Sequence, residues 1–145
     1  MAPATKAIYD FFQASTTHAF YIGIGGRLYQ LDGAPQNATY SYATFGFISA
    51  ADGDTFRETI AESIVQFRIF SIDPSRLACE ALLDACEALF NRADICPASG
   101  WTGFRMLREN IMYPFKNQKD DWSDYQAMVD FNAKIQKTCK NEVEL

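Results

Sequence analysis

The sequence predicts an α+β fold, made of an antiparallel β-sheet with one main helix packed on a face and a short N-terminal helix. Three observations predict it. Residues 125–135 alternate apolar and polar side chains, as a half-buried strand does. Residues 74–90 repeat apolar side chains at helical spacing. The expected elements follow the order helix, strands, helix, strands, which is typical of a single long helix packed on antiparallel strands.

The chain begins with an expected helix over residues 5–14. Apolar residues such as Ile8 and Phe12 recur there at helical spacing. Thr5 precedes them and is of a residue type that caps helix N-termini. The helix is therefore expected to be short and amphipathic.

Two strands are expected next, over Tyr40–Ile48 and Ser63–Phe70. The first is rich in Tyr, Phe and Thr, and the second places apolar and polar side chains on opposite faces. Asp52-Gly53 lies between them and is a turn signal. The two strands are therefore expected to form a hairpin with an irregular connection.

The main helix is expected over residues 74–90, because Asp73-Pro74 supplies an N-cap followed by proline at the first helical position. Its apolar face is predicted to consist of Leu77, Ala81, Leu82, Ala85, Ala88 and Leu89. The three leucines are expected to lie on the sheet face formed by Phe67, Phe131 and Ile135.

Two further strands are expected in the last third of the chain. Residues 101–109 are a strand candidate that Tyr113-Pro114 is expected to end. The alternation over 125–135 predicts a long strand with one solvent-exposed face, as is common in antiparallel sheets. The sequence thus predicts a single domain over residues 1–137 and a polar C-terminal tail over 138–145.

Composition argues against several classes of protein. Thirteen Lys and Arg against eighteen Asp and Glu give a net charge of −5, whereas tight nucleic-acid binding depends on neutralising phosphates. No stretch approaches the roughly 20 apolar residues of a membrane span, and the N-terminus lacks a signal-peptide pattern. The expected location is therefore a cytoplasm, without membrane contact.

The four cysteines are expected to be free thiols. Cys79 and Cys86 are seven residues apart in a helical pattern, or roughly 10 Å, which is too far for a disulfide. Cys96 and Cys139 are isolated. With one histidine and no Cys-x-x-Cys pair, the sequence predicts no metal site.

No set of residues predicts catalysis or a cofactor. "GIGGR" leads into "RLYQL" and not into a helix, so a glycine turn with positive φ at Gly25 or Gly26 is expected in place of a phosphate loop. His18 has no nucleophile partner in the sequence pattern, and lone histidines more often cap helices or fill space. Carboxylate pairs such as Asp52/Asp54 and Asp120/Asp121 fall in polar runs typical of solvated loops. The chain is expected not to be an enzyme.

Two segments are candidates for contact with another protein. The glycine turn is expected to aim Arg27 and Tyr29, and "APQ" is expected to form a rigid exposed bend, with a plain connecting loop as the alternative. The segment "PFKNQKDDWSD" is read as a long charged loop that carries aromatic residues, with a solvated connection as the alternative. The predicted contact residues are Arg27, Tyr29, Pro35, Gln36, Lys116, Lys119 and Trp122.

Several segments together resemble a known family. They are "GGRLY", "APQNATYSYATFGF", "ESIVQFRIFS", "SRLACEALLDACEALF" and "DYQAMVDFNAKI", and the similarity spans about residues 5–137. In this order they resemble the tail terminator (tail completion) proteins of long-tailed bacteriophages and related gene-transfer particles.

The resemblance implies a structural virion protein of the tail and neck, assembled in the host cytoplasm. It implies a hexameric ring at the head-proximal end of the tail tube that stops tube growth and joins the head connector or stopper protein. DNA would pass through the lumen without specific binding, and no enzyme activity or cofactor is implied. The alternatives are another neck or head-tail joining protein and, third, a small-molecule-binding domain or enzyme of unfamiliar type.

Overall fold

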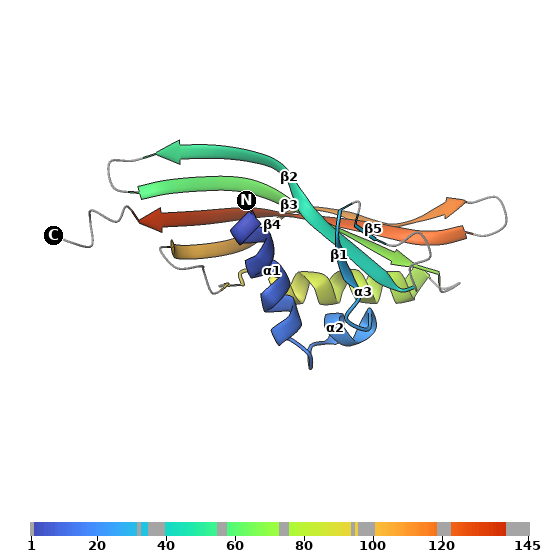
Figure 1. Cartoon of the computed structure of the whole chain (residues 1–145). Helices are drawn as coiled ribbons and strands as arrows, with labels where there is room; N and C mark the ends of the chain where they lie inside the picture. The colour runs from blue at the N-terminus through green and yellow to red at the C-terminus, as the bar shows by residue number, and fades with distance from the viewer. Residues whose placement is uncertain are drawn as a thin grey trace.

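The structure is a computed structural model that describes residues 2–31, 33–34, 40–54, 58–72, 76–93, 95, 101–118 and 123–138. Helices and strands form two layers, with the described helices on one face of a twisted sheet (Figure 1). In chain order the elements are α1 (Ala2–Ala14), α2 (Ala19–Gly23), β1 (Leu28–Gln30), β2 (Tyr42–Asp54), β3 (Glu58–Ser71), α3 (Arg76–Phe90), β4 (Trp101–Gln118) and β5 (Ser123–Thr138). The predicted α+β class is confirmed.

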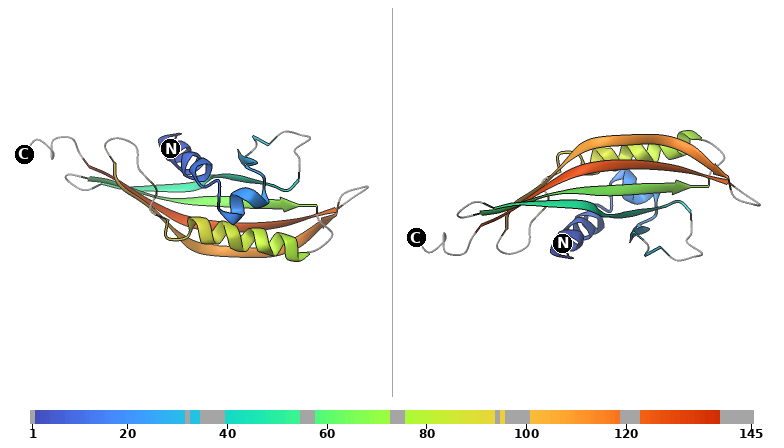
Figure 2. Two further views of the ribbon diagram at one scale, coloured as in Figure 1. Left: turned by 90° about the horizontal axis from the view of Figure 1, so that it is seen from below. Right: turned by 90° about the horizontal axis from the view of Figure 1, so that it is seen from above.

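Among the described residues, the sheet has five strands in the order β1-β2-β3-β5-β4. The hairpins β2–β3 and β4–β5 are joined by an antiparallel ladder between β3 and β5, from Glu58↔Thr138 to Ser71↔Tyr125. β1 pairs with β2 in parallel, over Ala43–Phe45. Figure 2 shows the helices in front of the sheet in one view and behind it in the other. The long strands are thus antiparallel as predicted, and the short parallel strand was not predicted.

The core lies between α3 and the sheet. The buried residues of α3 are Cys79, Leu83, Cys86 and Phe90. The Phe90 ring lies 4.5 Å from that of Phe67 and 6.2 Å from that of Phe131, between centroids. Because these rings join the helix to β3 and β5, they fix where α3 sits on the sheet.

The predicted apolar face of α3 is wrong in its rotation. Leu77 is 72% exposed, whereas Leu83 is fully buried. Leu82 and Leu89 are only partly buried at the margin of the core. The buried positions follow the spacing 79, 83, 86, 90, so Cys79 and Cys86 lie on the buried stripe, from which the prediction left them out. The Asp73-Pro74 cap and the Ile135 side chain lie outside the described residues.

The N-terminal helix begins earlier than predicted. α1 starts at Ala2, so Thr5 lies within the helix and the predicted N-cap is wrong. Ile8 and Phe12 are buried as expected. A second helix, α2, was not predicted, and His18 caps it, because the Phe20 N–H donates to His18 Nδ1 at 3.1 Å. His18 therefore has the capping role that lone histidines often have.

Two predicted strand ends are wrong. Asp52 and Gly53 are paired residues of β2, opposite Ala61 and Ile60, so the connection to β3 comes after Asp54. β4 passes through Tyr113-Pro114 and ends at Gln118. Pro114 is tolerated inside β4 because it lies at a register shift between Met112 and Phe115, on an outer strand of the sheet. In a central strand, proline would remove a hydrogen bond of the ladder.

The two described cysteines, Cys79 and Cys86, are free thiols, as predicted. Burial raises the pKa of Cys79 to about 11 and raises that of Cys86 well above its ordinary value. Cys96 and Cys139 lie outside the described residues. In the part of the chain that the structure describes, no helix is long and apolar enough to cross a membrane.

Candidate functional site

The turn at Gly25 and Gly26 joins α2 to β1. Both glycines have positive φ, at 59° and 73°, a region that L side chains rarely adopt. The predicted positive-φ turn is therefore confirmed, and both Gly25 and Gly26 have this backbone conformation. A phosphate loop leads from its glycines into a helix N-terminus. These glycines lead into β1, so the turn does not have the geometry of a phosphate loop.

Arg27 follows this turn and reaches toward the chain that enters β2. Its Nε donates to the Ser41 carbonyl at 3.1 Å, and Nη2 donates to the Tyr40 carbonyl at 3.3 Å. The Ala43 N–H also donates to the Arg27 carbonyl, at 3.1 Å. Arg27 therefore holds the start of β2 in place, in addition to the contact role predicted for it.

Tyr29, Tyr40, Tyr42 and Phe70 form an aromatic cluster. The rings of Tyr42 and Phe70 are stacked with centroids 4.8 Å apart, and Tyr40 and Tyr29 meet Tyr42 edge-on at 5.1 and 5.9 Å. Tyr42 precedes the buried core residue Ala43, so its side chain lies on the opposite face of the sheet from the helices. The aromatic cluster thus lies on the face that the described helices leave uncovered.

A buried carboxylate lies beside the aromatic cluster. Asp124, at the start of β5, is 1% exposed, and its Oδ2 accepts the Tyr40 hydroxyl at 3.0 Å. Its Oδ1 accepts from Gln126 Nε2 at 3.5 Å. Burial, followed by this hydrogen bond to Asp124, raises the pKa of Tyr40. Tyr40 therefore keeps its proton and connects the entry of β2 to the β4–β5 hairpin.

The open face, by which we mean the sheet face away from the helices, is polar at its centre and apolar along β4. At the centre Gln66 Nε2 donates to Asp130 Oδ1 at 3.1 Å, and Arg68 Nε donates to Gln66 Oε1 at 2.7 Å. Met112 is 48% exposed and Phe115 is 37% exposed on β4. Large exposed apolar side chains that lie close together are typical of contact surfaces.

The two predicted contact segments meet at one end of the sheet. A row of paired residues crosses the four long strands there: Tyr42, Phe70, Gln126 and Phe115. The first segment enters this row through β2, and the second segment enters it through the β4–β5 hairpin (Figure 1). The structure therefore brings Arg27 and Tyr29 to the same end of the sheet as Lys116.

The second segment is mostly strand and not the long loop that was predicted. Lys116 lies within β4, is exposed and pairs with Tyr125. Lys119 and Trp122 lie outside the described residues, as do Pro35 and Gln36. The contact roles of all seven predicted residues remain predictions.

Sequence reasoning missed Asp124, Tyr40 and Phe70. In the sequence, Asp124 resembles the acidic residues before it, which were expected to lie in a solvated loop. Nothing in the neighbouring sequence indicates that Asp124 is buried, because its partner is 84 residues away. The alternation of tyrosines in "TYSYATF" was the available signal for Tyr40, since alternate residues share a face of a strand.

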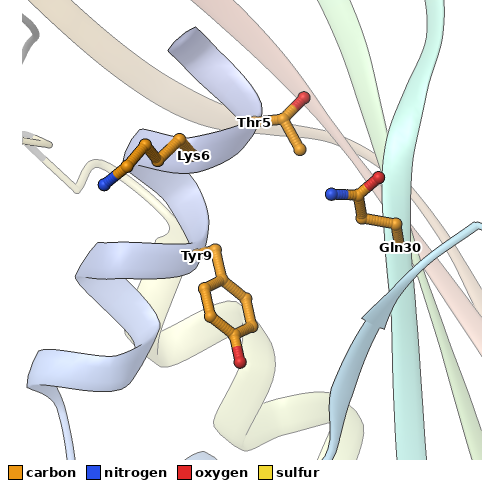
Figure 3. A pocket seen from close by; sticks show the side chains of 4 residues that line it. All are labelled: Thr5, Lys6, Tyr9 and Gln30. Atoms are coloured by element: carbon orange, nitrogen blue, oxygen red, sulfur yellow. The ribbon is translucent and has the colours of Figure 1, made fainter. Parts of the chain in front are cut away.

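The helix side carries a shallow depression between α1 and β1. Thr5, Lys6, Tyr9 and Gln30 line it, and Figure 3 shows their side chains around it. Lys6 Nζ is paired with Asp10 Oδ2 at 2.6 Å, and both groups are exposed. Among the described residues no group of three or more His, Cys, Asp or Glu could hold a metal ion.

The fold has a counterpart among solved structures. A chain of the "virion of native gene transfer agent (GTA) particle" is similar, with a TM-score of 0.71 and 15% sequence identity. The similarity covers 93% of this chain and 96% of that chain. No protein-family model and no curated protein matches the sequence. The two chains thus share a fold over nearly their whole lengths.

Proposed function

We propose that the chain is a structural virion protein that terminates a phage-like tail. The observation that carries the proposal is the shared fold with a chain of a gene transfer agent virion, because it covers 93% of this chain and 96% of that one. The sequence resemblance to tail terminators was drawn from segments distributed over the same length. Fold alone does not define function, so both observations are needed.

In the proposed role, copies of the chain form a hexameric ring on the head-proximal end of the tail tube. The ring stops tube polymerisation and presents a surface to the head connector or stopper protein. DNA passes through the lumen without specific binding, which agrees with a net charge of −5. The chain performs no catalysis and needs no cofactor, and it is located in the virion tail and neck after assembly in the host cytoplasm.

The geometry supports a protein-contact role at one end of the sheet. Tyr113 is 57% exposed and Phe115 is 37% exposed there, and Lys116 follows them. Aromatic side chains are enriched where proteins meet, since they bury a large area with few rotatable bonds. This end is therefore the proposed site of contact with the tube or the connector.

Tail assembly in the presence and absence of the protein tests the proposal. Tube protein would be polymerised with and without purified chain, and tube lengths measured by electron microscopy. We expect a defined cap at one tube end and shorter tubes in its presence, and native mass measurement should give a hexamer. Binding to the connector alone, with unchanged tube lengths, would favour another head-tail joining protein instead.

A further inference from the structure

The helix side of the molecule exposes large apolar side chains to solvent. Leu77 is 72% exposed on α3, and Ile22 is 65% exposed on α2. The two helices pack closely, because a Cβ at Gly23 would overlap a methyl carbon of Leu82. Figures 1 and 2 both show α2 beside α3. Exposed apolar side chains on neighbouring elements are typical of surfaces that bind a partner.

One side of α3 points away from the sheet, and we call it the outer face of α3. It consists of Leu77, Ala81, Asp84 and Ala88, which are all exposed. Their spacing of four, three and four residues places them on one side of the helix, opposite the buried stripe that contains Leu83. Alanine side chains are short, so this face allows a second helix to approach closely.

The outer face is acidic along the flank nearer β4. Glu80, Asp84 and Glu87 follow one another along α3 at helical spacing. Arg108 Nη1 pairs with Glu87 Oε1 at 3.0 Å, whereas Glu80 and Asp84 form no ion pair with any described residue. A depression of about 400 Å³ lies beside this flank, and the described residues that line it are Asp84, Glu87, Ala88 and Asn91. The flank therefore has unpaired carboxylates and room for long side chains of a partner.

No described helix of this chain complements the outer face. α1 contains a single cation, Lys6, whose Nζ is paired with Asp10 Oδ2 at 2.6 Å. α2 contains no charged residue, and α3 is itself the acidic helix. Charge complementarity requires Lys or Arg beside Glu80 and Asp84. The occupant is therefore a segment of a different protein, with apolar side chains on one side and cations along one flank.

We propose that the outer face of α3, together with Ile22, is a docking site for a basic amphipathic helix of another protein. The apolar side of that helix covers Leu77 and Ile22, and its cations meet Glu80 and Asp84. The occupant is a helix and not an added strand, because the middle of α3 offers side chains but no free backbone groups. The proposal goes beyond the proposed function, since this docking needs neither a ring nor a tail tube.

Binding of a synthetic peptide tests the docking site. The probe is a fluorescently labelled amphipathic helix with leucines on one side and lysines along one flank, and its counterpart carries glutamates in place of the lysines. Fluorescence anisotropy would measure the binding of each peptide to the full chain. We expect the lysine peptide to bind with an affinity that falls as salt rises, and the glutamate peptide not to bind.

Matched variants locate the binding on the molecule. Leu77→Asp and Asp84→Lys should each weaken binding by about tenfold or more, because they remove the apolar anchor and reverse the charge of the flank. Leu107→Asp makes the first exchange at a residue that is 47% exposed on the open face, and Glu109→Lys makes the same change of charge on β4. Both controls should keep the affinity of the parent protein. Circular dichroism checks that all four variants are folded.

The outcomes separate this inference from the proposed function. No binding of the lysine peptide, equal binding of both peptides, or equal affinity of all variants would overturn the inference, and capped tubes would then leave the tail function standing. A change of native mass in Leu77→Asp without peptide would assign the outer face to a second copy and would also overturn it. Peptide binding at the outer face without capped tubes would support the docking site and contradict the proposed function.

Discussion

At the scale of single residues, the environment of the Tyr40 phenol predicts that the protein loses stability at alkaline pH. Burial and the hydrogen bond to Asp124 raise the pKa of Tyr40 above its ordinary value of 10.0. The folded state then binds the proton more tightly than the unfolded state, so this stabilisation is complete below pH 10 and is lost as pH rises toward the folded pKa. We expect the free energy of unfolding to fall above about pH 10, and less steeply in Tyr40→Phe.

Urea unfolding at several pH values from neutral to strongly alkaline measures this slope. Tyr113→Phe is the matched control, because the Tyr113 side chain is 57% exposed and its hydroxyl makes no hydrogen bond to the described residues. That control should keep the slope of the parent protein. Identical slopes in all three proteins would show that the Tyr40–Asp124 bond does not contribute to stability.

Gly25 offers a second test at this scale. Its φ is 59°, and a Cβ there would lie 2.7 Å from a guanidinium nitrogen of Arg27. Gly25→Val should therefore destabilise the fold by about 1–3 kcal/mol, the usual cost of a side chain forced into this backbone region. Gln30→Val, at an exposed strand residue, should change stability by less than about 0.5 kcal/mol. Denaturant unfolding of both variants checks the difference.

The limits of sequence reasoning at this scale follow from distance along the chain. The positive-φ turn was predictable, because Gly25-Gly26 is a local signal. The partners of Arg27, the carbonyls of Tyr40 and Ser41, are 13 and 14 residues away and could not be read from the sequence. The same applies to Asp124, which is buried only because the entry of β2 meets the β4–β5 hairpin.

At the scale of elements, the rotation of α3 makes a sharp prediction. Leu83 is fully buried and Leu77 is 72% exposed, although the sequence pattern placed Leu77 in the core and not Leu83. Leu83→Ala should cost about 2–5 kcal/mol of stability, because it leaves a cavity against the sheet. Leu77→Ala should cost less than about 0.5 kcal/mol. Equal losses in thermal or urea unfolding would contradict the placement of α3.

The reason for the wrong face is physical. The predicted apolar stripe was drawn from the alanines and leucines of α3 alone, and the cysteines, which were expected to be free thiols, were left out of it. Free cysteine behaves as a small apolar residue that is commonly buried, so Cys79 and Cys86 belong to the stripe with Leu83 and Phe90. The existence of the helix was predictable from its periodicity. Which face it buries could be predicted only if the two cysteines were treated as apolar residues.

Strand ends were less predictable than strand existence. Proline was expected to end β4, yet Pro114 lies in a bulge of a strand at the edge of the sheet. A proline in a central strand would remove a ladder bond, while one at an edge need not. Edge position is a property of the whole sheet, so the sequence of β4 could not reveal it.

At the scale of the whole molecule, the β4–β5 hairpin gives the assembly prediction. Replacement of Lys116, Lys119 and Trp122 together by alanine should leave the monomer folded, since Lys116 is an exposed strand residue. It should weaken ring formation or binding to the tube, because a contact at this end would lose its aromatic anchor and its charge. Circular dichroism checks the fold of the monomer, and native mass measurement checks assembly. Unchanged assembly would show that this end of the hairpin is a solvated connection and not a contact site.

The order of the strands also determines how fast the different parts of the sheet can form. The hairpins β2–β3 and β4–β5 are local, and such hairpins form in about 1–10 μs. The central ladder joins β3 to β5, and even its nearest partners, Ser71 and Tyr125, are separated by α3 and β4. Sheets built on such distant pairs fold in milliseconds to seconds.

During synthesis, β3 is complete before β5 has been made. At roughly 5–20 residues per second, translation from Ser71 to Thr138 takes on the order of 3–13 s. For that interval the strand that carries Val65, Phe67 and Ile69, all fully buried in the finished protein, has no partner on its inner side. The nascent chain is therefore most exposed to aggregation on the ribosome, and the last strand to be translated is the one that ends this exposure.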